Sequence, residues 1–400
     1  MKGVRIEAQA TQGAATKTPY RMRRIGGTGR RRFPGNVLAR AALALIALAV
    51  GGPATGGESR RAAVGQDVST GGEGRAVVVL TTEPAAEEAP LGPLARKALA
   101  DRAALTEAGL ERAEVEAAGR RLVVWRGGTG PHLVLLHGSG QQAGAWADVA
   151  PALLDDRTVH VLDLPGHGDS EPVEGTLHMS YLVEGVEAYL ASLDGPAIVV
   201  GNSLGAWLAT IAAHRHPETV ARAVLVDGGA LLNVPAEGLS LVPADREAAR
   251  RVMAAVRDPA SPQLTDEELD ELVTRSDGGA TARMLQDVPG LMAHLLDGRL
   301  GEVVVPVEVV WGASDRLMPL DYARRMTAAL PRARLTVIER CGHIPPAECP
   351  DRFLAVLEEL LASPMPAARA AEPEAATEPV AAAEQAPASG EPPADPEPAP

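Results

Sequence analysis

The chain has 400 residues and a formal net charge of −14, and this acidic balance argues against nucleic acid as a partner. It has only two cysteines, Cys341 and Cys349, which excludes a cysteine-cluster metal site and a framework of several disulfides. Aromatic residues form 2% of the chain, so alanine, leucine and valine have to fill the interior of a folded domain.

Residues 1–54 are predicted to be a targeting segment. Arginines recur between positions 21 and 32, with no acidic residue among them, and an apolar stretch follows over 41–50. That stretch is shorter than the roughly 20 apolar residues of a membrane-spanning helix. The pattern is typical of a secretory signal, and Arg30-Arg31-Arg32-Phe33 loosely resembles a twin-arginine signal. We therefore expect export to the periplasm or the medium; a disordered basic leader and an uncleaved membrane anchor are the alternatives.

Residues 55–110 are predicted to form a linker and then an edge helix. Residues 55–90 are rich in glycine, alanine, glutamate and threonine, whereas apolar residues recur at helical spacing over 91–110. At the other end, residues 363–400 consist mostly of alanine, proline and glutamate, a composition that cannot bury a core. We expect this tail to be a disordered, solvated extension, with a spacer or a docking segment as alternatives.

Strand and helix patterns alternate between these ends. Expected strands occupy residues 111–117, 121–125, 132–136, 158–162, 196–200, 223–226, 306–311 and 334–338, and expected helices occupy 146–154, 181–193 and 204–216. This alternation implies right-handed crossovers and a mostly parallel sheet, hence an α/β fold. Its core is expected in two parts, over 111–229 and 304–362. Between them, residues 230–303 have helical periodicity interrupted by prolines, which predicts a helical cap inserted above the strand ends.

Gly201-Asn202-Ser203-Leu204-Gly205 stands between an expected strand and an expected helix. A serine on so sharp a turn is held in strained dihedrals, and the chain two residues to either side passes close enough to favour glycine. The following helix presents its N-terminal N–H groups to negative charge that develops there. We therefore expect Ser203 to be a nucleophile; the alternative is a glycine-flanked turn with an idle serine.

A serine hydroxyl needs a base to take its proton. Of the nine histidines, only His343 is expected in a loop just after a late strand and behind a glycine. Asp315 follows another late strand, and its carboxylate at the same sheet edge would orient the imidazole and stabilise the imidazolium. Asp227 also ends a strand and is the competing candidate for this role.

At this point the region over about 111–361 resembles the α/β-hydrolase superfamily. His137-Gly138-Ser139-Gly140 is similar to the oxyanion-loop motif, and the stretch from Asp163 to Ser170 is similar to a G-x-G-x-S turn. The elbow around Ser203 follows, and then Trp311-Gly312-Ala313-Ser314-Asp315 and Gly342-His343 resemble the acid and histidine loops, in the order serine, aspartate, histidine.

The resemblance implies the α/β-hydrolase fold with a helical cap, and a serine hydrolase without a cofactor or a metal. The backbone N–H groups of Ser139 and Leu204 are expected to form the oxyanion hole. A carboxylesterase acting on small or medium esters through an acyl-enzyme is the first expectation. We expect no nucleic acid partner and no membrane span after processing, and the oligomeric state is left open.

Two other functions stay open. Asn202, Pro319-Leu320-Asp321 and Cys341-Gly342-His343 resemble hydrolases that cleave carbon–carbon bonds of ring-cleavage products. However, Ser139-Gly140-Gln141-Gln142 replaces the glycine-rich oxyanion loop of that group, and Ile344 replaces its usual tryptophan. A non-catalytic binding module on the same fold is the third reading, and it is expected to have lost part of the triad.

The two cysteines bracket His343. A disulfide between Cys341 and Cys349 would tie the two ends of the histidine loop, and it would require an oxidising compartment, in agreement with export. Two free thiols, one buried behind the histidine and one at a helix start, are the alternative.

Overall fold

The structure is a computed structural model, and it describes residues 90–364 except 234–235 and 237–238. The export segment expected over 1–54, the linker as far as residue 89 and the tail from residue 365 lie outside the described residues.

A single eight-stranded sheet has the order β1-β2-β4-β3-β5-β6-β7-β8. The strands are Glu111–Ala117, Arg120–Gly127, His132–Leu136, Thr158–Leu162, Ala197–Asn202, Val220–Val226, Val307–Gly312 and Ala333–Ile338, for β1 to β8. β2 pairs antiparallel with β1 and with β4, whereas all the pairs from β4 to β8 are parallel. The predicted mostly parallel α/β sheet is confirmed.

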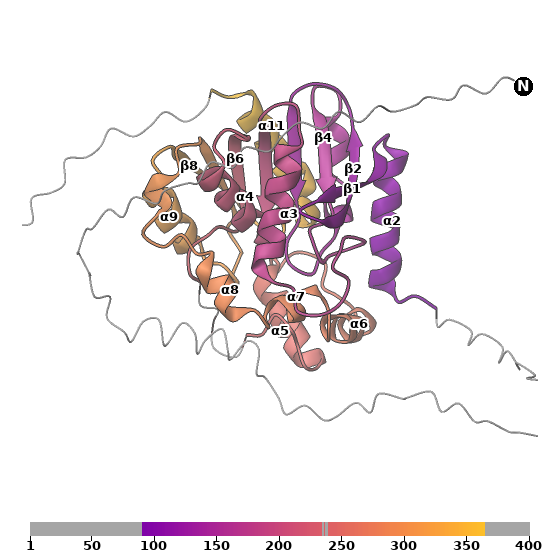
Figure 1. The fold of residues 1–400 in the computed structure, drawn as a ribbon. Coiled ribbons are helices and arrows are strands. Elements are labelled where there is room, and N and C mark those ends of the chain that lie inside the picture. Colours follow the sequence, from indigo (N-terminus) through magenta and orange to yellow (C-terminus); the bar gives the residue numbers. More distant parts are fainter. Residues whose placement is uncertain (1–89, 234–235, 237–238, 365–400) are drawn as a thin grey trace, which may run out of the picture. The chain divides into compact units, whose positions relative to one another are not determined.

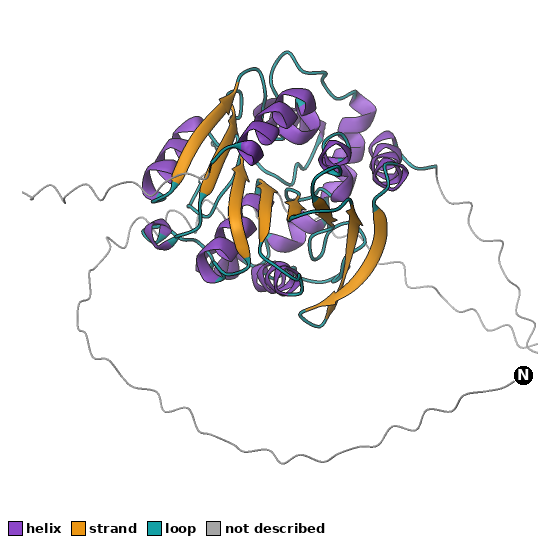
Figure 2. Ribbon diagram, turned by 90° about the horizontal axis from the view of Figure 1, so that it is seen from above, coloured by secondary structure: helices purple, strands orange, loops and turns teal. Residues whose placement is uncertain are grey.

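Helices cover both faces of the sheet (Figure 2). On one face α3 (Met179–Ala191), α4 (Leu204–Arg215) and α9 (Leu320–Ala329) pack over apolar strand residues. On the other face the core contains α11 (Pro350–Ala362) and residues of α2 (Pro93–Glu107). Burial on both faces explains why the central strands are continuous apolar runs.

Two stretches differ from the sequence expectation. Residues 146–154 form no continuous helix: two 3₁₀ turns, η1 (Ala143–Trp146) and η2 (Ala150–Leu153), are separated by a turn at 147–149. Pro151 lacks the N–H that a continuous helix needs and disfavours helical dihedrals in the residue before it. The helix α9, which completes the alternation between β7 and β8, was not among the expected elements.

The segment between β6 and β7 contains α5 (Arg246–Val256), α6 (Asp266–Ser276), α7 (Ala280–Met284), α8 (Val288–Ala293) and η3 (Leu300–Glu302). The start of α5 is capped by Asp245, and Thr265 begins α6 with a capping box. Figure 1 shows α5 to α8 grouped at one end of the sheet. No helix in the described part of the chain is long and apolar enough to cross a bilayer.

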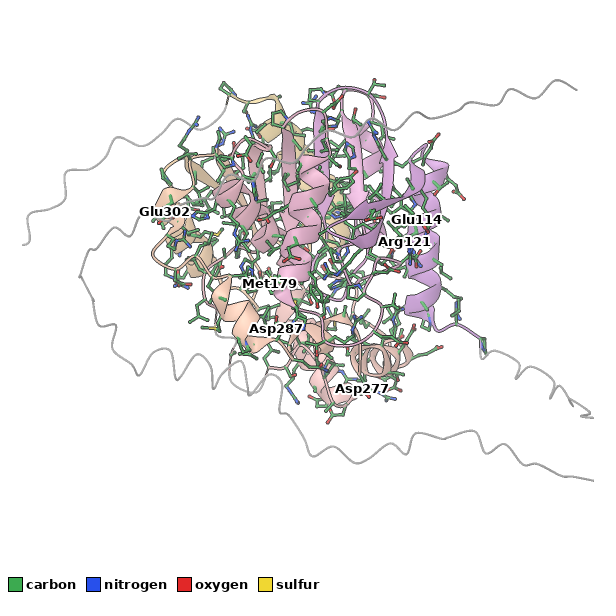
Figure 3. All side chains as sticks on the ribbon, viewed as in Figure 1. Glu114, Arg121, Met179, Asp277, Asp287 and Glu302 are labelled. Carbon is green, nitrogen blue, oxygen red and sulfur yellow. A yellow bond between two sulfur atoms is a disulfide. The ribbon has the colours of Figure 1, made fainter. Side chains whose placement is uncertain are left out.

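Hydrogen bonds join this helical group to the core. Asp287, the residue before α8, accepts a hydrogen bond from the N–H of Met179 at 3.0 Å, and Figure 3 labels both at the junction of α3 and α8. Arg283 of α7 donates through Nε to the Gly175 carbonyl at 2.7 Å. These contacts hold the helices over the ends of the strands, where the candidate site lies.

Candidate active site

Ser203 lies on the turn between β5 and α4, with φ 54° and ψ −113°. A Cβ on Gly201 would come within 2.2 Å of the Gly205 backbone, and a Cβ on Gly205 within 2.2 Å of the Leu136 carbonyl oxygen. Contacts this short are impossible, so both positions require glycine. The strained serine and its two glycines form the sharp turn that the sequence predicts.

His343 stands between Ser203 and Asp315. Its Nε2 is 2.9 Å from Ser203 Oγ, and its Nδ1 is 2.7 Å from Asp315 Oδ2. Asp315 Oδ1 accepts hydrogen bonds from the N–H groups of Leu317 and Met318, both at 2.9 Å. The Asp315 carboxylate accepts a hydrogen bond from Nδ1–H, which leaves the Nε2 lone pair facing the serine hydroxyl. The histidine is therefore oriented as a base toward Ser203.

Asp227, the competing candidate, lies behind Asp315 and makes no hydrogen bond to His343. Its Oδ1 accepts from the N–H of Gly312 at 2.9 Å. Burial, together with the neighbouring Asp315 carboxylate, raises the pKa of Asp227 well above its usual range. The structure thus brings Ser203, His343 and Asp315 into one hydrogen-bonded row. Asp227 is not part of this row.

Asp227, Asp315 and His343 are also the one acidic and histidine group in the described part of the chain that could hold a metal ion, with ligand atoms within 4.8 Å of one another. Their atoms already have other partners: His343 Nδ1 faces Asp315, and one Asp227 oxygen holds the Gly312 N–H. We therefore interpret His343 and Asp315 as members of the hydrogen-bonded row with Ser203, and not as metal ligands.

The loop after β3 supplies the expected oxyanion donors. Among the described residues, no acceptor occupies the backbone N–H of Ser139 or of Leu204. The loop is held by Gln141, whose Oε1 accepts from the Gly138 N–H at 2.8 Å. A Cβ on Gly138 would lie 3.2 Å from the Ser203 Cβ, so the loop passes directly beside the serine.

His137 supports this loop from beneath. Its Nε2 accepts from the Leu164 N–H at 3.0 Å, so Nδ1 carries the proton and donates to the Gly138 carbonyl at 2.8 Å. Burial lowers the pKa of His137 to about 4, which keeps the ring neutral. Ser139 Oγ in turn lies 2.8 Å from Thr281 Oγ1 of α7, which ties the oxyanion loop to the helical group above it.

Asn202 has a positioning role that the sequence did not reveal. Its Nδ2 donates to the His343 carbonyl at 2.9 Å and to the Val226 carbonyl at 3.2 Å, so the residue beside the nucleophile also holds the histidine loop. Glu348 holds the same loop through the Gly342 N–H at 2.9 Å. The Asn202 contact joins segments 141 positions apart in sequence, and no local pattern indicates it.

Cys341 and Cys349 are bonded to each other, with their Cα atoms 6.0 Å apart. The bond encloses His343 and both cysteines are buried. Of the two states that the sequence left open, the structure has the disulfide.

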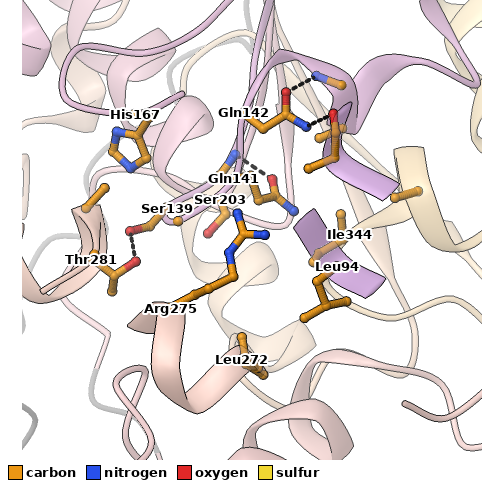
Figure 4. A pocket seen from close by; sticks show the side chains of 18 of the residues that line it. Leu94, Ser139, Gln141, Gln142, His167, Ser203, Leu272, Arg275, Thr281 and Ile344 are labelled. Carbon is orange, nitrogen blue, oxygen red and sulfur yellow. Dashed lines mark hydrogen bonds between the residues drawn. The ribbon is translucent and has the colours of Figure 1, made fainter. Parts of the chain in front are cut away.

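Ser203 and His343 face a cavity of about 670 Å³ between the sheet edge and the helical group. The walls are apolar on α5, with Val252, Met253 and Val256, and mixed elsewhere. Figure 4 shows Ser203 at the centre, with Ser139 and Thr281 on one side and Leu94 and Ile344 on the other. A cavity of this size suits a small organic molecule.

A model of the alpha/beta hydrolase family matches residues 133–356. The chain belongs to this family. The hydrolase is 32% identical over 234 residues to a 2-hydroxy-6-oxononadienedioate/2-hydroxy-6-oxononatrienedioate hydrolase of Cupriavidus pinatubonensis, which covers 53% of this chain and 80% of the relative. It is 29% identical over 265 residues to an uncharacterized protein of Mycobacterium tuberculosis, which covers 60% of this chain and 78% of the relative.

Solved structures resemble the hydrolase over a similar length. A meta-cleavage product hydrolase from Pseudomonas fluorescens matches with a TM-score of 0.54 and 25% identity, covering 62% of this chain and 97% of that one. A bacterial membrane phospholipase A matches with a TM-score of 0.58 and 25% identity, covering 68% of this chain and 93% of that one. The hydrolase is therefore similar both to a meta-cleavage product hydrolase and to a membrane phospholipase A.

Proposed function

We propose that this protein is a cofactor-free serine hydrolase that cleaves carboxylic esters through an acyl-enzyme. The observation that carries the proposal is the row from Ser203 Oγ through His343 to Asp315, with distances of 2.9 and 2.7 Å. In the described part of the chain, the backbone N–H groups of Ser139 and Leu204 make no hydrogen bond and are free to bind an oxyanion. A nucleophile, a base, an orienting acid and an oxyanion site together support acyl transfer.

The first half of the reaction forms the acyl-enzyme. Ser203 Oγ attacks the ester carbonyl carbon while His343 Nε2 takes the hydroxyl proton, and the carbonyl oxygen gains negative charge near the two N–H groups. Asp315 stabilises the imidazolium. The tetrahedral adduct then breaks its bond to the alcohol oxygen, which receives the proton from His343.

The second half restores the enzyme. His343 takes a proton from water, the hydroxide oxygen attacks the acyl carbon, and the bond to Ser203 Oγ breaks. The proton returns to Ser203, and a carboxylic acid leaves. Each step uses side chains that lie within hydrogen-bond reach in the structure.

Carbon–carbon bond hydrolysis is the second candidate, and the similarity to the Cupriavidus enzyme favours it. That relative is named for dicarboxylates. Every lysine and arginine that lines the described cavity is already paired with an acid: Lys97 with Asp101 at 2.8 Å, Arg102 with Asp169 at 3.0 Å and Arg275 with Glu271 at 3.4 Å. Because these cations are neutralised, a second substrate carboxylate would lack a free partner, and we rank the ester first.

A fluorophosphonate probe tests the proposal directly. We expect stoichiometric labelling of Ser203, and loss of both labelling and p-nitrophenyl ester turnover in Ser203→Ala, by about 10⁶ in rate. Ser192→Ala is the matched control, because that hydroxyl donates to the Tyr189 carbonyl at the end of α3. A chelator should have no effect on turnover.

Two outcomes would change the proposal. Labelling at another residue, or turnover that survives Ser203→Ala, removes the nucleophile assignment. Inactivity on esters combined with rapid cleavage of vinylogous diketones promotes the second candidate.

We further propose that the protein works outside the cytoplasm. The pattern of residues 1–54 and the disulfide of Cys341 with Cys349 support this, because such bonds persist in oxidising compartments. Cell fractionation followed by mass determination tests it: a processed chain in the exported fraction is expected, and a full-length cytosolic chain would contradict it.

A further inference from the structure

The helix α2 precedes the region that the hydrolase family model matches, yet it lines the cavity. The family match begins at residue 133, whereas α2 spans Pro93–Glu107. Leu94 and Ala98 on this helix belong to the cavity wall. The helix thus contributes to the site from outside the segment that the family model matches.

The N-terminal end of α2 is held by α6. The Glu271 carboxylate accepts hydrogen bonds from the Leu94 N–H at 2.7 Å and the Ala95 N–H at 2.8 Å. A carboxylate at this position satisfies free N–H groups of the first helical turn and complements the helix dipole. Glu271 is 13% exposed and pairs with Arg275 one turn later. The contact is thus largely shielded from solvent.

The C-terminal half of α2 is held by the core. Leu105 is fully buried in the apolar cluster that lies against β2 and β3. Arg102 pairs with Asp169 at 3.0 Å, and Gln142 Nε2 donates to the Ala98 carbonyl at 3.2 Å. With one end on the helical group and the other on the core, α2 spans one side of the cavity.

The cavity side of α2 has the apolar Leu94 and Ala98 together with the charged Lys97, Asp101 and Arg102. Ile344 follows His343 directly and lines the same cavity as Leu94 and Leu272 (Figure 4). On the other side of Ser203 the wall contains the hydroxyls of Ser139 and Thr281, which bind each other. Around Ser203 the wall therefore contains the apolar Leu94, Leu272 and Ile344, the charged Arg275 and, on the other side, the two hydroxyls.

We propose that α2 is a wall of the substrate site, and that Leu94, Leu272 and Ile344 bind the apolar acyl chain of a medium-chain or long-chain ester. This inference rests on the ester hydrolysis proposed above. Each methylene that this wall removes from water should raise kcat/KM by about fourfold. Preference for longer acyl chains then depends on a helix that precedes the segment matched by the family model.

The experiment compares two charge insertions on α2. Leu94→Glu places a carboxylate in the wall, whereas Leu99→Glu places it on the exposed side of the same helix, where Leu99 is 48% exposed. kcat/KM is measured on the acetate and octanoate p-nitrophenyl esters, with thermal midpoints to verify folding. Leu94→Glu should lower the octanoate-to-acetate ratio at least about tenfold, and Leu99→Glu should leave it within twofold of the wild type.

A second readout separates this inference from the proposed function. The rates at which a short-chain and a long-chain alkyl fluorophosphonate label Ser203 report chain binding without ester turnover. We expect the long-chain probe to label the wild type and Leu99→Glu faster than the short-chain probe, and Leu94→Glu to lose this difference. That result supports α2 as a wall of the substrate site, even if no ester is turned over. Equal chain preference in the wild type and both variants overturns it. A wild type that is neither active nor labelled overturns both.

Discussion

At the scale of single residues, the structure shows which of two aspartates, Asp315 or Asp227, contacts the catalytic histidine. Both end neighbouring strands and both are buried. Asp315 accepts two backbone N–H groups and faces His343. Asp227 accepts one such N–H, from Gly312, and makes no hydrogen bond to His343. Burial and the neighbouring Asp315 carboxylate raise the pKa of Asp227, which favours its protonated form relative to an ordinary aspartate.

This difference predicts the effect of two isosteric substitutions. Asp315→Asn should lower kcat by about 10⁴, because the amide favours the wrong tautomer of His343. Asp227→Asn should change kcat far less, because asparagine imitates a protonated carboxyl and keeps the acceptor for the Gly312 N–H. Steady-state kinetics on the ester that the enzyme prefers measures both, and the reverse ranking would transfer the acid role to Asp227.

The row of Ser203, His343 and Asp315 was predictable because each residue follows a strand, and parallel strands end at one sheet edge. The residues around them were not predictable in the same way. Asn202 reaches the His343 carbonyl across 141 positions of sequence, and Ser139 reaches Thr281 across 142. Contacts of this kind depend on how distant segments pack, and no local periodicity contains that information.

At the scale of elements, the loop between β8 and α11 is held from three directions. The disulfide closes it, Glu348 binds its Gly342 N–H, and Asn202 binds the His343 carbonyl. A base that must stay within hydrogen-bond reach of both Ser203 and Asp315 benefits from a loop with so little freedom.

The disulfide is expected to add about 2–3 kcal/mol to the free energy of unfolding, because it closes a short loop in the unfolded chain. The double variant Cys341→Ala/Cys349→Ala should lower the urea midpoint, and a reductant should lower that of the wild type but not of the variant. Non-reducing peptide mapping of the exported protein verifies the bond first. Free thiols at both positions would contradict the prediction.

Element predictions succeeded where apolar residues recur at regular spacing, and the helix expected over 146–154 was wrong. The eight strands and the helices α2, α3 and α4 appear close to their expected bounds. The helix expected over 146–154 is interrupted at 147–149, just before the turn that contains Pro151, and the N–H of Ala143 is bound by Asp163 at 2.7 Å. The helix α2 was expected at the domain edge, and its place on the cavity wall follows from Glu271, far away in the sequence.

At the scale of the whole molecule, buried neutral histidines connect folding to pH. Burial lowers the pKa of His137 to about 4 and those of His160 and His167 to about 3. The unfolded chain binds protons at these residues near pH 6.5. Between about pH 6.5 and 4 the unfolded state therefore holds more protons at the three histidines, and their contribution to stability is lost as the pH falls.

Asp227 has the opposite effect on the pH dependence of stability, so we compare the wild type with Asp227→Asn. Its folded pKa is raised, so above the unfolded pKa the folded state keeps a proton that the unfolded chain has released. Asp227 thus contributes stability below the unfolded pKa of about 3.9 and loses it as the pH rises. Urea unfolding of the wild type between about pH 4.5 and 6.5 should show stability falling with acidification.

Asp227→Asn removes the carboxyl group that binds this proton in the folded state. The acid-side fall of the variant should therefore be steeper than that of the wild type by about one proton, or about 1.4 kcal/mol per pH unit. The same substitution should make the variant relatively more stable near neutral pH, because asparagine needs no unfavourable ionisation next to Asp315. Asp163, whose pKa burial also raises, is common to both proteins and cancels in the comparison. If the stability of the two proteins changes with pH at the same slope, Asp227 is ionised in the folded protein and the prediction is wrong.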